Sequence, residues 1–363
     1  MNGTADQHRN IYEQVVEFID AGRSFALATV LRAEGSTPRK AGVRAIINEK
    51  GRIWGTLGGG AVEAEAQRRA VEACKSKQTI VFELALESAC ISGEDPICGG
   101  NMRILVDATV KKDRGSYAQA AQAVRQRRCG VLLTTVCTGA ETEVAVRWIP
   151  KEAIESGVGF PSREAIGSCL VREEASLFVQ QGQEPNIRKE SLVEPVVPMP
   201  MLLIVGGGHI GQALAQQAIL VGFDVVVLDD RPEFTDPALF PEGVATRCGD
   251  IRKEVDASAI GRDTYIVIVT RGHKHDADAL EACIHSPAAY IGMIGSKRKV
   301  ALMREDFIES GLAGEEEFGR VFAPVGLDIG AVTVPEIAAS IVAQLIAVRR
   351  KGGTKAGRGE KEP

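Results

Sequence analysis

A run of apolar residues that leads directly into closely spaced glycines places the strongest constraint on the fold of this chain. Residues 202–205 are Leu-Leu-Ile-Val, and Gly206, Gly208 and Gly211 follow them. This is the G-x-G-x-x-G pattern of a strand, a tight turn and a helix that bind a dinucleotide. The first glycine permits the turn, the second lets backbone approach a pyrophosphate, and the third lets the helix pack on the sheet. The pattern predicts a Rossmann domain that starts after residue 200.

A second apolar run, residues 225–228, ends at Asp229. Asp229 lies 18 residues beyond Gly211, close to the spacing at which a carboxylate binds the ribose hydroxyls of NAD. Arg231 follows at a position that suits a 2′-phosphate, so NADP stays open beside NAD. Fold alone does not establish a ligand, and a Rossmann domain that binds no nucleotide is the alternative.

The length of 363 residues is enough for two domains. Residues 181–200 carry four prolines and mixed charge, so we place the domain boundary near residue 198. We expect an α/β chain in which residues 1–197 form a mixed α/β domain. Residues 198–350 alternate strands and helices, as in a doubly wound parallel sheet, and residues 351–363 have the composition of a disordered tail.

Hydrophobic periodicity predicts the individual elements. In the first domain we expect helices over 11–22, 61–75 and 116–127, and strands over 24–31, 43–48, 52–57, 79–84, 102–106, 131–138, 142–148, 168–172 and 175–179. In the second we expect strands over 201–206, 224–228, 264–270 and 289–294, and helices over 209–221, 276–284, 297–311 and 334–350.

Composition excludes several classes of protein. The net charge is −5, which argues against a partner that is a nucleic acid or a membrane surface. No run approaches 18 apolar residues and the first residues lack the core of a signal peptide, so we expect a cytoplasmic protein. None of the eight cysteines forms a C-x-x-C pair, which favours free thiols over disulfides or structural zinc.

Three glycine-containing loops stand out in the first domain. Residues 34–42 contain Ser36, Thr37 and Arg39, and Gly58, Gly59 and Gly60 lie at a strand-to-helix junction where free amides suit a phosphate or carboxylate. Cys98 precedes Gly99 and Gly100, so its thiol is a candidate soft ligand or nucleophile. Each loop also suits an ordinary turn, but three in one domain favour a site built from loops.

Two loops of the second domain have open roles. His273, His275 or Asp276 would contact a ligand at the carboxyl end of the sheet, or Asp276 would cap the next helix while the histidines are solvated. Residues 324–330, Pro-Val-Gly-Leu-Asp-Ile-Gly, either contact a ligand or turn the chain.

These motifs together resemble the XdhC/CoxI family of xanthine-dehydrogenase accessory proteins. In the first domain the resemblance rests on Gly35–Arg39, Gly42, Gly55–Glu63 and Cys98–Gly100. In the second it rests on Gly206–Gly211, Asp229–Pro232, His273, Asp276, Asp278, Tyr290–Ser296 and Ala323–Gly330. The motifs occur in order over nearly the whole chain.

The resemblance implies a molybdenum-cofactor chaperone. Such a protein binds molybdopterin, assists its sulfuration by a cysteine desulfurase and delivers it to a molybdenum hydroxylase of the xanthine dehydrogenase type. Many relatives have Cys after the triple glycine, whereas this chain has Ala61. The predicted metal ligand is therefore Cys98 alone, and the alternative is a divergent paralogue that binds the cofactor differently and serves another hydroxylase. We also expect a homodimer, and we assign no catalytic residue.

The predicted cofactor-binding residues are Ser36, Thr37, Arg39, Gly58, Gly59, Gly60, Cys98, Gly206, Gly208, His209, Ile210, Gly211, Asp229, Arg231 and His273. The alternative is an NAD(P)-dependent oxidoreductase that acts on a small molecule or on the pterin, although spacing identifies no proton-transfer residue with an anchoring arginine. A nucleotide-sensing regulatory domain of the TrkA type shares the glycine pattern, but the first domain does not suit it.

Overall fold

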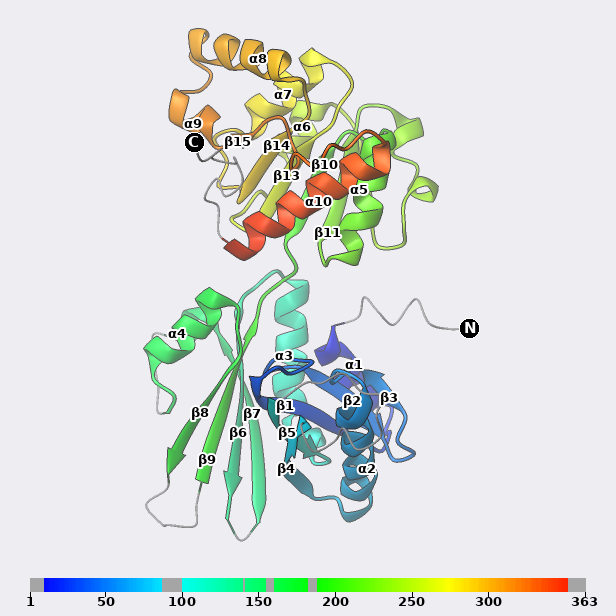
Figure 1. Ribbon diagram of the computed structural model, residues 1–363, viewed down its shortest axis with the longest axis vertical. Helices are drawn as coiled ribbons and strands as arrows, with labels where there is room; N and C mark the ends of the chain where they lie inside the picture. Colours follow the sequence, from blue (N-terminus) through cyan, green and yellow to red (C-terminus); the bar gives the residue numbers. More distant parts are fainter. Residues whose placement is uncertain (1–9, 87–99, 140, 155–159, 182–187, 352–363) are drawn as a thin grey trace. The chain divides into compact units, whose positions relative to one another are not determined.

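The computed structural model describes residues 10–86, 100–139, 141–154, 160–181 and 188–351 (Figure 1). The chain divides into two compact units, Met1–Pro198 and Met199–Pro363. We call them unit 1 and unit 2.

Unit 1 contains a five-stranded sheet in the order β3-β2-β1-β5-β4, in which neighbouring strands run antiparallel. Its strands are β1 (Phe25–Gly35), β2 (Arg44–Asn48), β3 (Ile53–Gly55), β4 (Thr79–Ala85) and β5 (Gly100–Asp107). Helix α2 (Gly60–Ser76) packs its small residues against Ala26, Ala28 and Val30 of β1. The alternate residues of β1, among them Leu27 and Leu31, face a second core.

That second core lies between the five-stranded sheet and a four-stranded sheet of order β7-β6-β9-β8. The strands are β6 (Gly130–Thr138), β7 (Thr142–Pro150), β8 (Ser176–Gln181) and β9 (Arg188–Val196). Helices α1 (Ile11–Asp20) and α3 (Arg114–Arg125) complete this core, and α4 (Arg163–Arg172) covers the other face of the four-stranded sheet.

Two sequence predictions in unit 1 were wrong. Residues 168–172, expected as a strand, belong to α4, which Ser162 caps through its side chain. Residues 181–200, which we expect from their prolines and mixed charge to form only the boundary between domains, contain β9, a central strand in which five successive residues from Glu190 to Glu194 are buried.

Unit 2 is a parallel six-stranded sheet of order β12-β11-β10-β13-β14-β15, as expected for a doubly wound Rossmann-like fold. Its strands are β10 (Met201–Val205), β11 (Asp224–Asp229), β12 (Ala245–Cys248), β13 (Thr264–Ile268), β14 (Tyr290–Met293) and β15 (Val321–Phe322). The two short strands β12 and β15 were not predicted, because two to four residues give too little periodicity.

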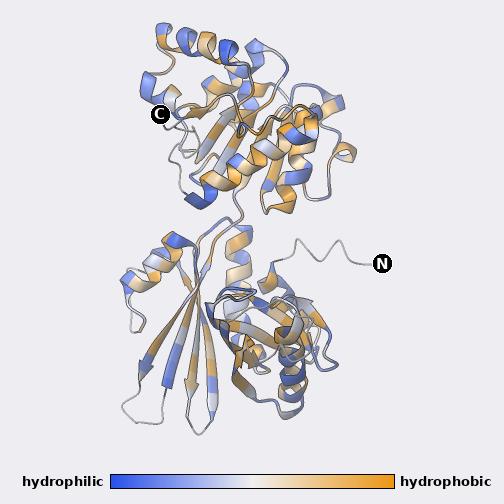
Figure 2. Ribbon diagram, viewed as in Figure 1, coloured by the Kyte–Doolittle hydropathy of each residue, from blue (hydrophilic) through white to orange (hydrophobic). Residues whose placement is uncertain are grey.

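Helices cover both faces of this sheet. On one face lie α5 (His209–Leu220) and α10 (Val334–Lys351), and the other core includes α6 (Ile251–Asp256), α7 (His273–Cys283), α8 (Lys297–Glu309) and α9 (Glu315–Gly319). Figure 2 shows apolar residues along the strands and polar residues on the outer turns of α8. Among the described residues, no helix is long and apolar enough to cross a membrane.

Candidate functional site

The glycine turn of unit 2 follows β10, and two of its glycines are required by close packing. A Cβ atom at Gly206, whose φ is +120°, would lie 2.5 Å from the carbonyl oxygen of Val269. A Cβ at Gly211 would lie 2.0 Å from the carbonyl oxygen of Gly206. At Gly208, in contrast, a Cβ would meet nothing within 4 Å. The backbone at Gly208 therefore borders open space, as the approach of a ligand to this turn requires.

The carboxylate of Asp229 is buried and its oxygens already accept four hydrogen bonds. Gly207 N donates to Oδ2 at 2.8 Å, while the Arg231 backbone N–H and the Arg231 guanidinium donate over 2.8–3.1 Å. Burial alone would raise the pKa of Asp229, but the hydrogen bonds from Arg231 and Gly207 outweigh it and lower the pKa. The position expected for a ribose diol is therefore filled by Arg231.

The chain after Asp229 folds back on the glycine turn. The Arg231 guanidinium carbon lies 3.8 Å from the centre of the Phe234 ring. A Cβ atom at Gly207 would lie only 2.1 Å from the carbonyl oxygen of Phe234. A dinucleotide ribose at Asp229 thus requires Arg231 to move first.

The carboxyl edge of the sheet also holds a polar cluster beside the glycine turn. Asp276, fully buried in α7, accepts hydrogen bonds from Thr270 Oγ1 and from Lys299 Nζ of α8, both at 2.5 Å. Asp276 therefore joins α7 to α8 and to the loop after β13, and it does not cap α7. His273 is half exposed, with Nε2 3.8 Å from Asp306 Oδ2, and His209 is exposed at the first residue of α5.

In unit 1, the structure brings together the described parts of the three loops singled out in the sequence. A Cβ at Gly100 would lie 2.6–2.9 Å from atoms of Glu34, Ser36 and Thr37. A Cβ at Gly58, whose φ is +116°, would lie 2.6 Å from the Pro38 ring and 3.3 Å from Arg39. We call the set Ser36, Thr37, Arg39, Gly58, Gly59, Gly60 and Gly100 the loop cluster.

The amides of this glycine turn are partly used within the chain. Glu63 Oε1 accepts hydrogen bonds from Leu57 N and Gly59 N, both at 3.0 Å, and from Thr56 Oγ1 at 2.5 Å. Burial opposes the charge on Glu63, but these bonds lower its pKa below the ordinary value. The turn therefore carries its own carboxylate, which sequence reasoning had not placed there. Beside Gly59 a Cβ would meet nothing within 4 Å, so this side of the turn is open.

Cys98 lies outside the described residues, as does Gly99. Among the described residues, no group of three or more His, Cys, Asp or Glu side chains is placed to hold a metal ion. The assignment of Cys98 as a metal ligand therefore stays a prediction.

Sequence reasoning missed two buried ion pairs that join the sheets of unit 1. Arg44 Nε of β2 lies 2.7 Å from Glu194 Oε2 of β9, and Arg103 Nη2 of β5 lies 2.6 Å from Glu190 Oε2 of the same strand. No local signal could have found them, because the partners are 150 and 87 residues apart.

Known domain families match both units. Residues 18–84 match the XdhC and CoxI family, and residues 202–345 match the XdhC Rossmann domain. A crystal structure described as a xanthine dehydrogenase from Bacillus halodurans has the same fold, with a TM-score of 0.74 and 23% identity over 96% of this chain and 98% of that one.

Three relatives are similar over almost the whole chain. A protein of Bacillus subtilis, described as a probable subunit of xanthine dehydrogenase, is 24% identical, over 94% of this chain and 98% of its own length. The molybdenum cofactor insertion chaperone PaoD of Escherichia coli is 26% identical, over 95% of this chain and 89% of its own. YqeB of Escherichia coli, described as uncharacterized, is 26% identical over 94% of this chain, which spans only 46% of that protein.

Proposed function

Because the chain belongs to the XdhC and CoxI family, we propose that it is an accessory protein that carries the molybdenum cofactor to a hydroxylase of the xanthine dehydrogenase type. The observation that carries the proposal is the meeting of separate loops in unit 1, where residues 36–39 contact Gly58 and Gly100. A chaperone needs a site that can release its cargo, and loops on a rigid sheet provide one.

The cofactor is the cargo, and its molybdenum and dithiolate are soft groups for which a thiolate is the suitable partner. We assign that role to Cys98, whose sequence neighbour Gly99 precedes Gly100 of the loop cluster. Glu63 holds the turn 57–59 in place, while the open side of Gly59 leaves room for the pterin. Since Glu63 already supplies a negative charge there, the phosphate end of the cargo would lie away from this carboxylate.

The test is the molybdopterin that copurifies with the full chain. We expect Cys98→Ala to lose most of the bound cofactor, whereas Cys248→Ala, which removes an exposed thiol of unit 2, leaves it unchanged. Equal occupancy in the two variants would remove Cys98 from the site. Transfer of the bound cofactor to an apo hydroxylase tests delivery, and a failure of transfer from loaded protein would contradict the chaperone role.

Sulfuration with a cysteine desulfurase, and assembly as a homodimer, belong to the same proposal. Coupled purification with a desulfurase and light scattering of the full chain test them separately. A monomer that releases fully sulfurated cofactor without a desulfurase would contradict both.

The alternative, an NAD(P)-dependent oxidoreductase, is the weaker interpretation of unit 2. The carboxylate that would bind the ribose is engaged by Arg231 and the Gly207 amide. Calorimetry with NADH and NADPH distinguishes the oxidoreductase from the cofactor chaperone. Tight binding of either nucleotide by the wild-type chain, together with hydride transfer to a substrate, would favour the oxidoreductase.

A further inference from the structure

A hollow of about 870 Å³ lies in unit 2 beside the loop that joins β15 to α10. The described residues that line it include none from the glycine turn 206–211, so it is a separate feature. Residues 323–331 of this loop form one side, and Lys297, Val300, Ala301 and Arg304 of α8 form another. Its volume falls in the range of about 300–1,000 Å³ that is usual for small-molecule sites.

The loop of residues 323–331 that lines the hollow is fixed by hydrogen bonds to α10. Gln344 of α10 accepts hydrogen bonds from Gly326 N at 2.9 Å and from Tyr290 OH at 2.5 Å, and its amide donates to Gly326 O at 3.2 Å. Gly326 has a φ of +93°, and Leu327 N donates to Ser340 O. A preformed loop loses little entropy when it binds a ligand.

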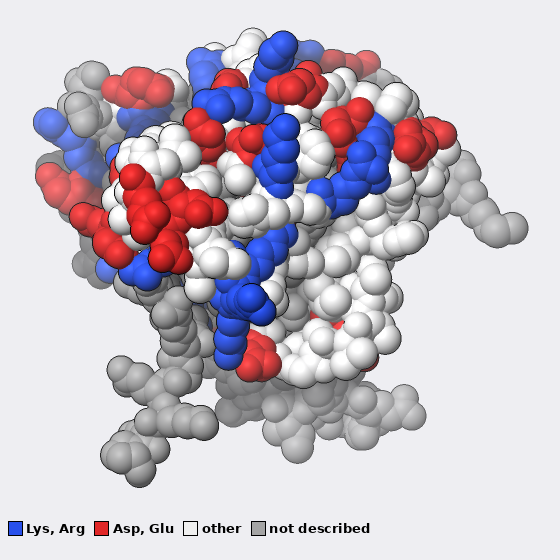
Figure 3. Space-filling model, turned by 90° about the horizontal axis from the view of Figure 1, so that it is seen from above, with Lys and Arg blue, Asp and Glu red and all other residues white. Residues whose placement is uncertain are grey.

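The hollow combines an apolar wall with positive charge. Val300, Val325 and Ile337 contribute to the wall, and the ring of Phe322 stacks on Tyr290 with centroids 4.7 Å apart. Lys297, Arg304 and Arg320 outnumber the single lining carboxylate, Asp328. The face shown in Figure 3 carries Lys and Arg interspersed with Asp and Glu, so it is not uniformly basic.

Several hydrogen-bond donors around the hollow are available. Arg304 pairs with Glu315, whereas within the described chain Lys297 has no carboxylate partner. Among the described residues, none accepts a hydrogen bond from the four amides of residues 328–331, although the amides of Val332 and Thr333 donate to Glu336. Lys297 and this run of free amides line the same hollow, and a cation together with backbone amides is a donor set suited to a phosphate.

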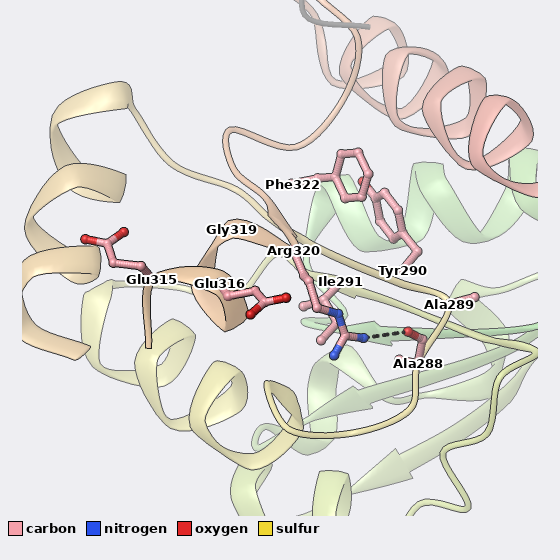
Figure 4. A pocket seen from close by; sticks show the side chains of 9 residues that line it. All are labelled: Ala288, Ala289, Tyr290, Ile291, Glu315, Glu316, Gly319, Arg320 and Phe322. Carbon is pink, nitrogen blue, oxygen red and sulfur yellow. Dashed lines mark hydrogen bonds between the residues drawn. The ribbon is translucent and has the colours of Figure 1, made fainter. Parts of the chain in front are cut away.

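A second, smaller hollow of about 360 Å³ adjoins the first and shares Gly319, Arg320 and Phe322 with it (Figure 4). Figure 4 shows the Arg320 guanidinium directed at Ala288, whose carbonyl oxygen accepts its hydrogen bond at 3.1 Å. The rings of Tyr290 and Phe322 lie side by side in the same view. Arg320 and the aromatic pair therefore form a fixed wall between the two hollows.

We propose that the larger hollow binds a phosphorylated planar heterocycle, with Lys297 and the amides of residues 328–331 toward the phosphate. The ring would lie against the apolar wall that includes Phe322, and Asp328 would accept a hydrogen bond from a ring N–H or a ribose hydroxyl. Two sources share this chemistry, a nucleotide and the phosphorylated pterin of the cargo. The hollow lies in unit 2 and the loop cluster in unit 1, so the nucleotide as ligand stands without the proposed function, whereas the pterin as ligand rests on it.

The experiment is calorimetry on the full chain with nucleoside monophosphates, the matching nucleosides, inorganic phosphate and isolated molybdopterin. We expect one of the phosphorylated heterocycles to bind at least about tenfold more tightly than its unphosphorylated form or phosphate alone. Binding of a nucleotide alone identifies that source. Binding of molybdopterin identifies the other only if the variants of the hollow weaken it, because the loop cluster of unit 1 is proposed to bind the same molecule. Equal binding of inorganic phosphate, or no binding of any phosphorylated heterocycle, would overturn the inference.

Variants locate the binding. Lys297→Gln removes the free cation, and Ala301→Phe fills the hollow from an exposed helical position of α8 that tolerates a larger side chain. Both variants should raise the Kd of the phosphorylated heterocycle by about tenfold or more. The control Lys253→Gln on α6 should leave this Kd within about twofold of the wild-type value. An unchanged Kd in the first two variants would refute the site. If no phosphorylated heterocycle binds to the hollow but the Ala301→Phe variant still copurifies with molybdopterin, the hollow is refuted and the proposed function is not.

Discussion

The ion pair between Arg44 and Glu194 offers the sharpest test of how unit 1 is held together. Both side chains are almost completely buried, at 2% and 9% exposure. Arg44 also donates to Tyr117 OH at 3.2 Å and to Thr134 Oγ1 at 2.9 Å. Burial alone would lower the pKa of Arg44, but Glu194 beside it raises the pKa above its ordinary value, so the guanidinium is charged.

We expect Glu194→Gln to destabilise unit 1 by about 3–5 kcal/mol, because it leaves a buried cation without its counter-charge. The amide keeps the shape of the side chain and still accepts the hydrogen bond that Tyr12 OH gives to Glu194, so lost packing contributes little. At an m-value of about 1–3 kcal/mol/M, the urea midpoint should fall by more than about 1 M.

The assay is urea unfolding followed by tryptophan fluorescence. The chain has two tryptophans, Trp54 and Trp148, and both lie in unit 1, so the signal reports this unit alone. Lys40→Gln is the matched control, because Lys40 pairs with Glu174 at the surface with exposures of 84% and 57%. Its cost should stay below about 1 kcal/mol.

The double variant Arg44→Met/Glu194→Gln distinguishes charge from packing. Removing both charges should recover part of the loss, since buried pairs replaced by neutral groups are often no less stable. A Glu194→Gln variant that costs no more than Lys40→Gln would refute the reasoning.

Three further outcomes follow from described contacts. Gly211→Ala should destabilise unit 2 by at least about 2 kcal/mol, because its Cβ would lie 2.0 Å from the Gly206 carbonyl; wild-type hydrogen-exchange protection in unit 2 would contradict this. The pKa of Asp229 is lowered in the fold, so its stabilisation is present above the unfolded value of about 3.9 and is lost as pH falls through the folded value. Asp229→Asn should abolish that part of the acid dependence measured by calorimetry, and an unchanged slope would show that other groups cause it. Glu63→Ala should cost about 1–3 kcal/mol in the tryptophan assay, because it leaves the Leu57 and Gly59 amides unpaired, and no change would mean that water replaces it.

The fold of unit 2 could be predicted because its strands are apolar runs and its helices are long enough for periodicity to show. Strand β9 was not predicted, because its inward-facing positions 190 and 194 are acidic, whereas inward-facing positions of a strand are usually apolar. Their partners, Arg44 and Arg103, lie far away in the sequence, so only the folded chain reveals why the carboxylates are buried.

The candidate site shows a similar division. Spacing placed Asp229 correctly at the end of its strand, yet it did not show that the carboxylate is occupied. A signal was present, since Arg231 follows at a distance that allows a local ion pair. The role of Glu63 was hidden in the same way, because a carboxylate in the first turn of a helix can cap the chain itself as readily as leave its amides to a ligand.

The two carboxylates of β9 also fix how this strand is aligned with the five-stranded sheet. Glu190 and Glu194 are four residues apart on one face, and each meets an arginine from a different strand of the five-stranded sheet, β5 and β2. A slip of β9 by one residue would turn both carboxylates to the opposite face, and a slip by two would leave both arginines mispaired. Only one alignment satisfies both contacts, so the sheet that carries the loop cluster is held in a single register against β9.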